Sequence, residues 1–476
     1  MQKSKLHNIF LEQGKNRFQD PRPILNNTEG SLIDCNGNFI ALSWVGTKGN
    51  ICILDPANPV RISEKVKLIK GAHEGFVSNV KFSPFRPNLL ASCADDCLIK
   101  LWQIPEGGLV EDMSEEIQKF RGHMKRPFCT EFHPCCEEII ASTGHDRNVI
   151  VWNIQNAETL FSVATPEDNF GCVWSYNGAL LGSSSRNHTY IIDPRTSSIV
   201  TTINSHTGIK PAKMNWISEN FVTSFGCTKD NRREVKLFDL RKVTDGVVSE
   251  EVVQSYADTK APFIWTFYDY SLKLLYLTGK GEGTYHIYDL SNDTMIPCNK
   301  LLSQSHLGLC QFPKKLMDYN RLEVMKFCTL EDKHLGFDSF IIPRKNKIYD
   351  PTLYPDILTF ENCISVDDWK SGNNAQPTTK PIDTIENKFV SEPIKFEKKV
   401  EEKVLSPEEK LAEAQSQIYA LQKEINELKR ENLELKSKLA KQAAAPQPEP
   451  EAVAPQPEPE TAAPQQEPDV AAAPEE

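Results

Sequence analysis

The residues most suited to catalysis form a set of four side chains that occurs twice in the sequence. Each copy contains a histidine, a serine, an aspartate and a tryptophan, 50 residues apart: His73, Ser92, Asp96 and Trp102, then His123, Ser142, Asp146 and Trp152. Histidine, serine and aspartate are also the residue types of a hydrolytic triad. A set that recurs in successive repeats is more typical of an internal scaffold, in which each buried polar group has a hydrogen-bond partner. We therefore interpret both sets as structural networks.

The two sets lie in longer repeated segments that predict the fold. The stretches LLASCADDCLIKLW (89–102) and IIASTGHDRNVIVW (139–152) align without a gap, and each follows an alternating run that ends in Phe-x-Pro. Weaker copies of this pattern occur at 39–55, 180–193, 222–242 and 275–290. At this spacing, the roughly 350 residues between Asp20 and Trp369 would hold about seven units. We therefore predict an all-β fold, a seven-bladed WD-repeat β-propeller.

Three other motifs could bind a phosphate or a metal ion, and each has a simpler interpretation. The sequence GKGEG (279–283) lies between two predicted strands and lacks the Lys-Ser/Thr ending and the helix of a phosphate loop. Cys93 with Cys97, and Cys135 with Cys136, have no second pair at zinc-site spacing. Nothing outside the repeated sets arranges a nucleophile, a base and oxyanion donors. We therefore predict no enzyme activity, no catalytic residue, no metal site and no cofactor.

Composition narrows the class of protein. The 476 residues include 54 basic and 65 acidic side chains, a net charge of −11, which argues against nucleic-acid binding through general basicity. Thirteen cysteines, an odd number, are expected to be reduced thiols. No stretch of 18 apolar residues is present, and residues 1–18 lack the apolar run of a signal peptide. These features predict a soluble cytosolic protein without a transmembrane segment.

Composition also divides the chain into four regions. Residues 1–375 hold the predicted propeller with an N-terminal basic segment and a post-propeller extension, and the polar residues 376–405 are expected to form a flexible linker. Residues 406–442 have a helical pattern. Residues 443–476 form an Ala/Pro/Glu tail with APQPEPE repeats, and residues 446–476 hold eight of the acidic residues. We expect this tail to be disordered, as a spacer or solubilising segment, with partner binding as the alternative.

The helical region predicts a parallel coiled coil. Ser406-Pro407-Glu408-Glu409 is a typical helix start. Heptad positions a and d are apolar except for one asparagine: Leu411, Ile418, Ile425, Asn432 and Leu439 at a, and Ala414, Leu421, Leu428 and Leu435 at d. An asparagine at a fixes the register, and β-branched residues at a with leucine at d favour two strands. A solitary helix packed on the propeller is the alternative.

Clustered basic residues are the remaining candidates for a binding surface. The N-terminal segment carries five of them, and basic doublets recur in predicted loops: Lys3, Lys5, Lys15, Arg17 and Arg22, then Lys125-Arg126, Arg232-Arg233, Lys314-Lys315 and Arg344-Lys345. A solvated surface is the simplest interpretation of each. A nearly neutral propeller with clustered cations could also bind an acidic protein surface.

The order of motifs along the chain resembles the coronin family, regulators of the actin cytoskeleton. The resemblance covers residues 4 to 375 and the coiled coil. It is carried by these segments: SKLHN (4–8), SCADDCLIKLWQIPEGGL (92–109), GKGEGTYHIYDL (279–290), FPKKLMD (312–318), IPRKNKIYDPTLYPD (342–356) and DDWKSGNN (367–374).

The resemblance implies a function and partners. Coronins have a seven-bladed propeller with a post-propeller segment packed back on it, bind and crosslink filamentous actin, and oligomerise through the coiled coil. They act on the actin-related protein nucleating complex and with cofilin, in motility, at the cell cortex and in phagocytic or endocytic cups. The family's actin-binding Asp-x-Arg arrangement matches Asp20-Pro21-Arg22, which makes Arg22 the main expected actin contact and Lys5 a second one.

Some residues depart from the family pattern. Leu6, His7 and Asn8 stand where coronins prefer an aromatic residue, arginine and histidine. The segment KRENLE (429–434) fits the family's trimer motif only in part, so that a dimer and a trimer both stay open. Asp367-Asp368-Trp369 resembles the acidic-tryptophan peptides that bind the nucleating complex, but its position favours a structural role. The rival hypothesis is a generic WD-repeat scaffold or adaptor without direct filament binding.

Overall fold

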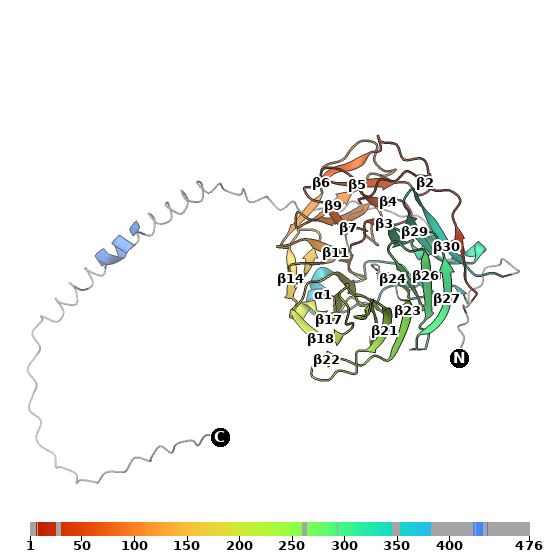
Figure 1. The fold of residues 1–476 in the computed structure, drawn as a ribbon. Helices are drawn as coiled ribbons and strands as arrows, with labels where there is room; N and C mark the ends of the chain where they lie inside the picture. The colour runs from red at the N-terminus through yellow and green to blue at the C-terminus, as the bar shows by residue number, and fades with distance from the viewer. Residues whose placement is uncertain are drawn as a thin grey trace, which may run out of the picture. The chain divides into compact units, whose positions relative to one another are not determined.

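The computed structural model describes Leu6, residues 8–24, 30–258, 264–292, 294–344 and 353–381, and, further along the chain, residues 422–423, 425–431 and 436. The chain divides into two compact units, Met1–Lys399 and Val400–Glu476. In the first unit, seven antiparallel sheets stand around a common axis (Figure 1). The predicted seven-bladed β-propeller is confirmed.

Blades 1 to 3 have four strands each. Blade 1 contains β3 (Ile33–Cys35), β4 (Ile40–Trp44), β5 (Gly49–Leu54) and β6 (Leu68–His73). Blade 2 contains β7 (Val77–Phe82), β8 (Leu89–Ala94), β9 (Leu98–Gln103) and β10 (Gln118–Arg121). Blade 3 contains β11 (Pro127–Phe132), β12 (Ile139–Gly144), β13 (Asn148–Asn153) and β14 (Thr159–Ala164).

Blades 4 to 6 follow the same order, with one added strand. Blade 4 contains β15 (Gly171–Trp174), β16 (Leu181–Ser184), β17 (His188–Asp193) and β18 (Ser198–Asn204), with the 3-10 helix η1 (Pro194–Thr196) and the parallel strand β22 (Val247–Val248). Blade 5 contains β19 (Lys213–Trp216), β20 (Phe221–Cys227), β21 (Arg233–Asp239) and β23 (Val253–Asp258). Blade 6 contains β24 (Ile264–Asp269), β25 (Leu274–Gly279), β26 (Thr284–Asp289) and β27 (Ile296–Leu302).

Blade 7 closes the ring with strands from both ends of the propeller sequence. It contains β28 (Gly308–Gln311), β29 (Glu323–Leu330) and β30 (His334–Ile341), with η2 (Lys314–Leu316) and η3 (Tyr319–Arg321) between β28 and β29. The N-terminal strands β1 (Phe10–Gln13) and β2 (Phe18–Gln19) both pair with β30. Closure in this way gives β30 a partner on both sides and leaves no long unpaired edge there.

Apolar residues hold the blades against one another. One core cluster joins blades 1 and 2 and includes Ile51, Val77 and Trp102, each essentially inaccessible to water. The first strands of neighbouring blades lie side by side around the axis, as with β3 and β7. The alternation of apolar and polar residues that indicated strands in the sequence therefore serves inter-blade packing.

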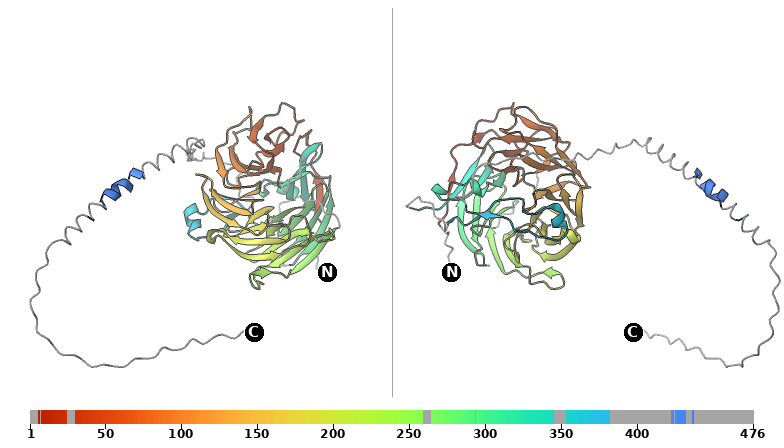
Figure 2. Two further views of the ribbon diagram at one scale, coloured as in Figure 1. Left: turned by 60° about the vertical axis from the view of Figure 1, so that its left-hand side comes forward. Right: turned by 180° about the vertical axis from the view of Figure 1, so that it is seen from behind.

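The post-propeller extension crosses one end of the propeller (Figure 2). It contains β31 (Ile357–Leu358), the short helix α1 (Val366–Lys370) and β32 (Thr379–Lys380). Trp369 is fully buried, and its indole N–H donates to the Gly178 carbonyl at 3.0 Å. Its ring packs edge-on against His133 and Trp174. The structural role predicted for the Asp367-Asp368-Trp369 segment is confirmed.

The second unit is described only in part. Residues 425–431 are helical, and Ile425 and Leu428 are 49% and 55% exposed. The other predicted coiled-coil core positions lie outside the described residues: Leu411, Ala414, Ile418, Leu421, Asn432, Leu435 and Leu439. Most of the predicted linker and all of the predicted tail also lie outside them. In the part of the chain that the structure describes, no helix is long and apolar enough to cross a membrane.

Candidate interaction surface at the propeller closure

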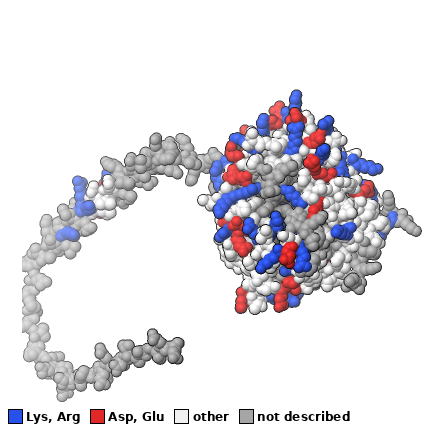
Figure 3. Space-filling model, viewed as in Figure 1, with Lys and Arg blue, Asp and Glu red and all other residues white. Residues whose placement is uncertain are grey.

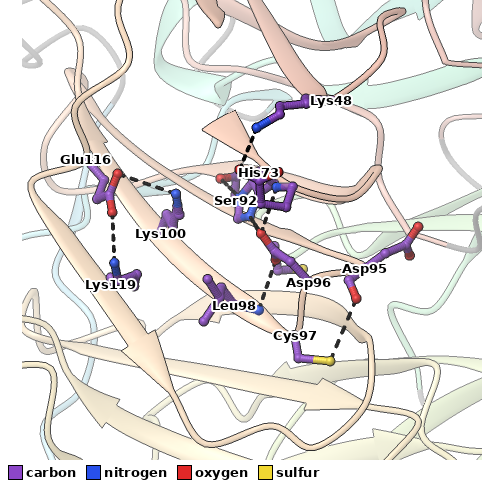
Figure 4. A network of polar contacts seen from close by, with 12 residues as sticks. Lys48, His73, Ser92, Asp95, Asp96, Cys97, Leu98, Lys100, Glu116 and Lys119 are labelled. Atoms are coloured by element: carbon purple, nitrogen blue, oxygen red, sulfur yellow. Dashed lines mark hydrogen bonds and ion pairs between the residues drawn. The ribbon is translucent and has the colours of Figure 1, made fainter. Parts of the chain in front are cut away.

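The repeated histidine sets form closed hydrogen-bond chains inside blades 2 and 3. His73 Nδ1 lies 3.0 Å from the Asp96 carboxylate, and His73 Nε2 lies 2.8 Å from Ser92 Oγ (Figure 4). The Trp102 indole N–H donates to Ser92 Oγ at 2.8 Å. The corresponding distances among His123, Asp146, Ser142 and Trp152 are 2.9, 2.7 and 2.8 Å.

The direction of these bonds explains why the set is structural. The serine oxygen accepts from the indole, so its hydroxyl can donate to histidine Nε2, which leaves Nδ1–H to donate to the aspartate. Ser92 is fully buried and His73 is 1% exposed, so a substrate has no access to them. Burial opposes ionisation of Asp96, but the interaction with His73 and the hydrogen bonds from the Leu98 and Glu74 backbone N–H groups together outweigh it and lower the pKa of that carboxyl. Every member of the chain is satisfied.

A third network in blade 5 was missed in the sequence. His206 Nδ1 lies 2.8 Å from Glu234 and its Nε2 lies 3.0 Å from Ser224 Oγ. Glutamate replaces aspartate here, and the longer turn between β20 and β21 shifts the spacing. The His-x-Gly sequence shared by His206 and His73 was the signal that could have revealed it.

Arg22 lies where the N-terminal segment joins blade 7 to blade 1. The Asp20 backbone N–H donates to the Lys333 carbonyl at 3.0 Å, on the blade 7 side. On the blade 1 side, the Arg22 carbonyl accepts from the Val45 N–H at 3.0 Å. Asp20 has a φ of +56°, and its carboxylate accepts from Arg61 Nε at 2.7 Å. The backbone of Asp20-Pro21-Arg22 is thus held from both sides.

The Arg22 side chain is held much less firmly than its backbone. Its guanidinium lies 2.7 Å from Glu64, with the two side chains 51% and 78% exposed. An exposed ion pair of this kind contributes about 0–1 kcal/mol. A carboxylate of a partner protein can therefore replace Glu64 at small cost. Lys5, the second predicted contact, lies outside the described residues.

Further cations and apolar side chains surround this point. We define the loop face as the end of the propeller that carries the β4–β5 and β29–β30 turns and the loops entering β7, β11 and β19. Lys and Arg side chains are interspersed with acidic ones on this face (Figure 3). Exposed basic and apolar residues in these connections and in the neighbouring blade 1 segment are Lys48, Arg61, Lys125, Lys210 and Lys333, and Val45, Phe76, Met124 and Ile209.

Fold and repeats first define a class. Residues 64–103 and 114–153 match the family model described as "WD domain, G-beta repeat". With the seven blades and the His/Ser/Asp/Trp networks, these matches define a WD-repeat β-propeller protein.

The proteins to which most of the chain is similar are coronins. The chain is 26% identical to Coronin-A of Dictyostelium discoideum, covering 79% of this chain and 84% of that protein. It is 25% identical to human Coronin-2A, covering 79% and 73%. The crystal structure of the WD40 domain of Toxoplasma gondii coronin matches with a TM-score of 0.75 and 28% identity, covering 79% of this chain and 98% of that one. The predicted resemblance to the coronin family is confirmed.

The match does not extend over the whole of every relative. Similarity to the coronin-like protein of Saccharomyces cerevisiae is 26% over 78% of this chain, but covers only 59% of that protein. For the coronin-like protein crn1 of Schizosaccharomyces pombe the covered share is 64%.

Proposed function

We propose that this protein binds filamentous actin through the loop face of its propeller, with Arg22 as a central contact. The observation that carries the proposal is the exposed Arg22 guanidinium on a restrained backbone, in a chain related to coronins over about four fifths of its length. Binding of a protein surface, without catalysis, also agrees with histidine networks that are closed inside the blades.

The geometry suggests how such a contact would work. The backbone around Arg22 is fixed by hydrogen bonds to two blades, so binding would order one side chain and little else. An arginine can form a bidentate bond with a carboxylate of an acidic surface. The nearby exposed Val45 and Phe76 would add apolar contact area. Because the charges are exposed, the interaction should weaken as salt concentration rises.

Crosslinking is a further part of the proposal. Ile425 and Leu428, at adjacent a and d positions, present an exposed apolar stripe on the helical segment 425–431. Such a stripe supports self-association through a coiled coil. Two or more linked propellers would bind a filament with higher avidity and could bridge two filaments. Action on the actin-related protein nucleating complex and with cofilin, at the cell cortex and in endocytic or phagocytic cups, belongs to the same proposal.

Co-sedimentation of the full chain with filamentous actin tests the central contact. We expect wild type to pellet with filaments less as salt rises, and Arg22→Glu to bind at least about tenfold more weakly, a loss of about 1.4 kcal/mol. Arg321→Glu is the matched control, because Arg321 is 47% exposed in a 2.7 Å pair with Glu12 and lies at the opposite end of blade 7.

The outcomes separate the hypotheses. An equal loss of binding in both variants would mean that only the net charge of the protein matters. Undiminished binding by a folded Arg22→Glu chain would show that Arg22 is not part of the contact. If wild type itself does not pellet at low salt, the generic WD-repeat scaffold becomes the better hypothesis, with a different protein partner on the loop face.

A further inference from the structure

Three buried cysteines converge where blade 7 meets blade 1. Cys35 ends β3, and Cys310 and Cys328 face each other across β28 and β29. Their relative exposures are 5%, 3% and 0%. The Cys310 and Cys35 sulfur atoms lie 3.4 Å apart, and all three lie within 4.8 Å of one another. Among the described residues, no other set of three potential metal ligands is this close.

The spacing matches what a thiolate-bound ion requires. Three sulfurs about 2.3 Å from one central ion would lie roughly 4 Å apart in a trigonal arrangement. The Cys310–Cys35 separation is 3.4 Å and no sulfur pair is more than 4.8 Å apart, so each separation need change by less than about 1 Å to reach that value. Zinc prefers four ligands. An all-sulfur site with three donors better suits the softer, low-coordinate Cu(I).

We propose that Cys35, Cys310 and Cys328 form a binding site for a thiophilic monovalent ion, Cu(I), which links blade 7 to blade 1. Binding forms three Cu–S bonds, with each thiol proton released to solvent and no change in oxidation state. This inference is independent of the proposed actin binding.

The simpler interpretation is that the three thiols are small apolar side chains in the core. They belong to a buried cluster with Phe312, Leu330 and Leu335. The chain contains a control for this alternative. Cys129 on β11 and Cys172 on β15 also meet between the first strands of neighbouring blades, where the Cys129 thiol donates to the Cys172 carbonyl at 3.8 Å. Among the described residues, no third potential ligand lies close enough to complete a set of three with that pair.

Competition for Cu(I) under anaerobic conditions tests the site. The full chain is first alkylated in its native state to block accessible thiols such as the exposed Cys363, then titrated with Cu(I) buffered by bathocuproine disulfonate. We expect one Cu(I) per chain, affinity at least about tenfold lower in Cys310→Ser, and no change in Cys129→Ser. A wild type that retains no Cu(I), or a Cys310→Ser chain that binds as wild type does, would overturn the proposal.

A second measurement does not depend on the folding of a variant. X-ray absorption on the Cu(I)-loaded wild type should show three sulfur neighbours. Two sulfur neighbours would indicate binding at a cysteine pair and would contradict the three-thiol site.

Discussion

Blades 3 and 7 each bury a histidine and an aspartate, but the two blades use them differently. In blade 3, His123 and Asp146 are joined at 2.9 Å in a chain that ends on Trp152. In blade 7, His306 Nε2 and Asp338 lie 4.0 Å apart, and neither ring nitrogen of His306 has a hydrogen-bond partner among the described residues. The same residue types thus form a complete network in one blade and an incomplete one in the other.

The difference shows what can replace a polar network. Asp338 accepts from Ser303 at 2.6 Å and from Tyr285 at 3.3 Å, and Tyr285 stacks on Phe327 and meets Phe340 edge-on. Blade 7 also gains β1 as its fourth strand. We infer that aromatic packing and strand pairing hold blade 7 together, while blade 3 depends on its hydrogen-bond chain.

Breaking the blade 3 chain should have the largest effect. Ser142→Ala leaves the Trp152 N–H and His123 Nε2 buried without their shared partner, and each such group costs about 1–3 kcal/mol. We expect a loss of about 3 kcal/mol in the free energy of unfolding, measured by urea denaturation. Ser162→Ala, at an exposed serine of β14 in the same blade, should change stability by less than about 0.5 kcal/mol. A similar loss in both variants would contradict this role of the network.

The buried aspartates of blades 3 and 7 should change the free energy of unfolding with pH in opposite directions. Burial opposes ionisation of Asp146, but the interaction with His123 and two backbone N–H groups together outweigh it and lower the pKa of Asp146. The resulting stabilisation is present above the unfolded value of about 3.9 and is lost as pH falls from that value through the lower folded pKa. Urea unfolding between pH 3 and 7 should show a destabilisation by Asp146→Asn that shrinks in acid. A constant difference across this range would argue against the ionised pair.

The smallest effect is expected in blade 7. Burial raises the pKa of Asp338, so its charged form is disfavoured in the fold and costs stability as pH rises through that pKa. Asp338→Asn keeps an oxygen that can accept from Ser303 and removes the charge. At pH 7 we expect a change near zero or a gain of up to about 1 kcal/mol. A loss above about 2 kcal/mol would mean that the His306–Asp338 pair is stabilising after all.

The sequence predicted the structural features that repeat within each blade. It missed contacts between residues that are far apart along the chain. The networks of blades 2 and 3 were visible because four distinct side chains recur at one spacing. Glu234 was missed because it stands in place of the aspartate of blades 2 and 3. Its side chain is one methylene longer and follows a longer turn, yet its carboxylate still reaches His206. The thiols of Cys35 and Cys310 meet although 275 residues separate them, and neither lies in a metal-binding spacing. Contacts of this kind depend on which blades are neighbours in the closed ring, and no short sequence motif shows that.

The pairing of Phe10 with Ile341 has a consequence for synthesis of the chain. Strand β1 receives its partner β30 only after some 330 further residues are made, which at roughly 5–20 residues per second takes about 20–60 s. During that time β30 does not yet exist, and β1 must stay unpaired in a crowded environment. Its short length and the polar residues Glu12 and Gln13 reduce the risk of pairing with a wrong strand. The ring can therefore be completed only late, when the oldest and newest parts of the propeller meet.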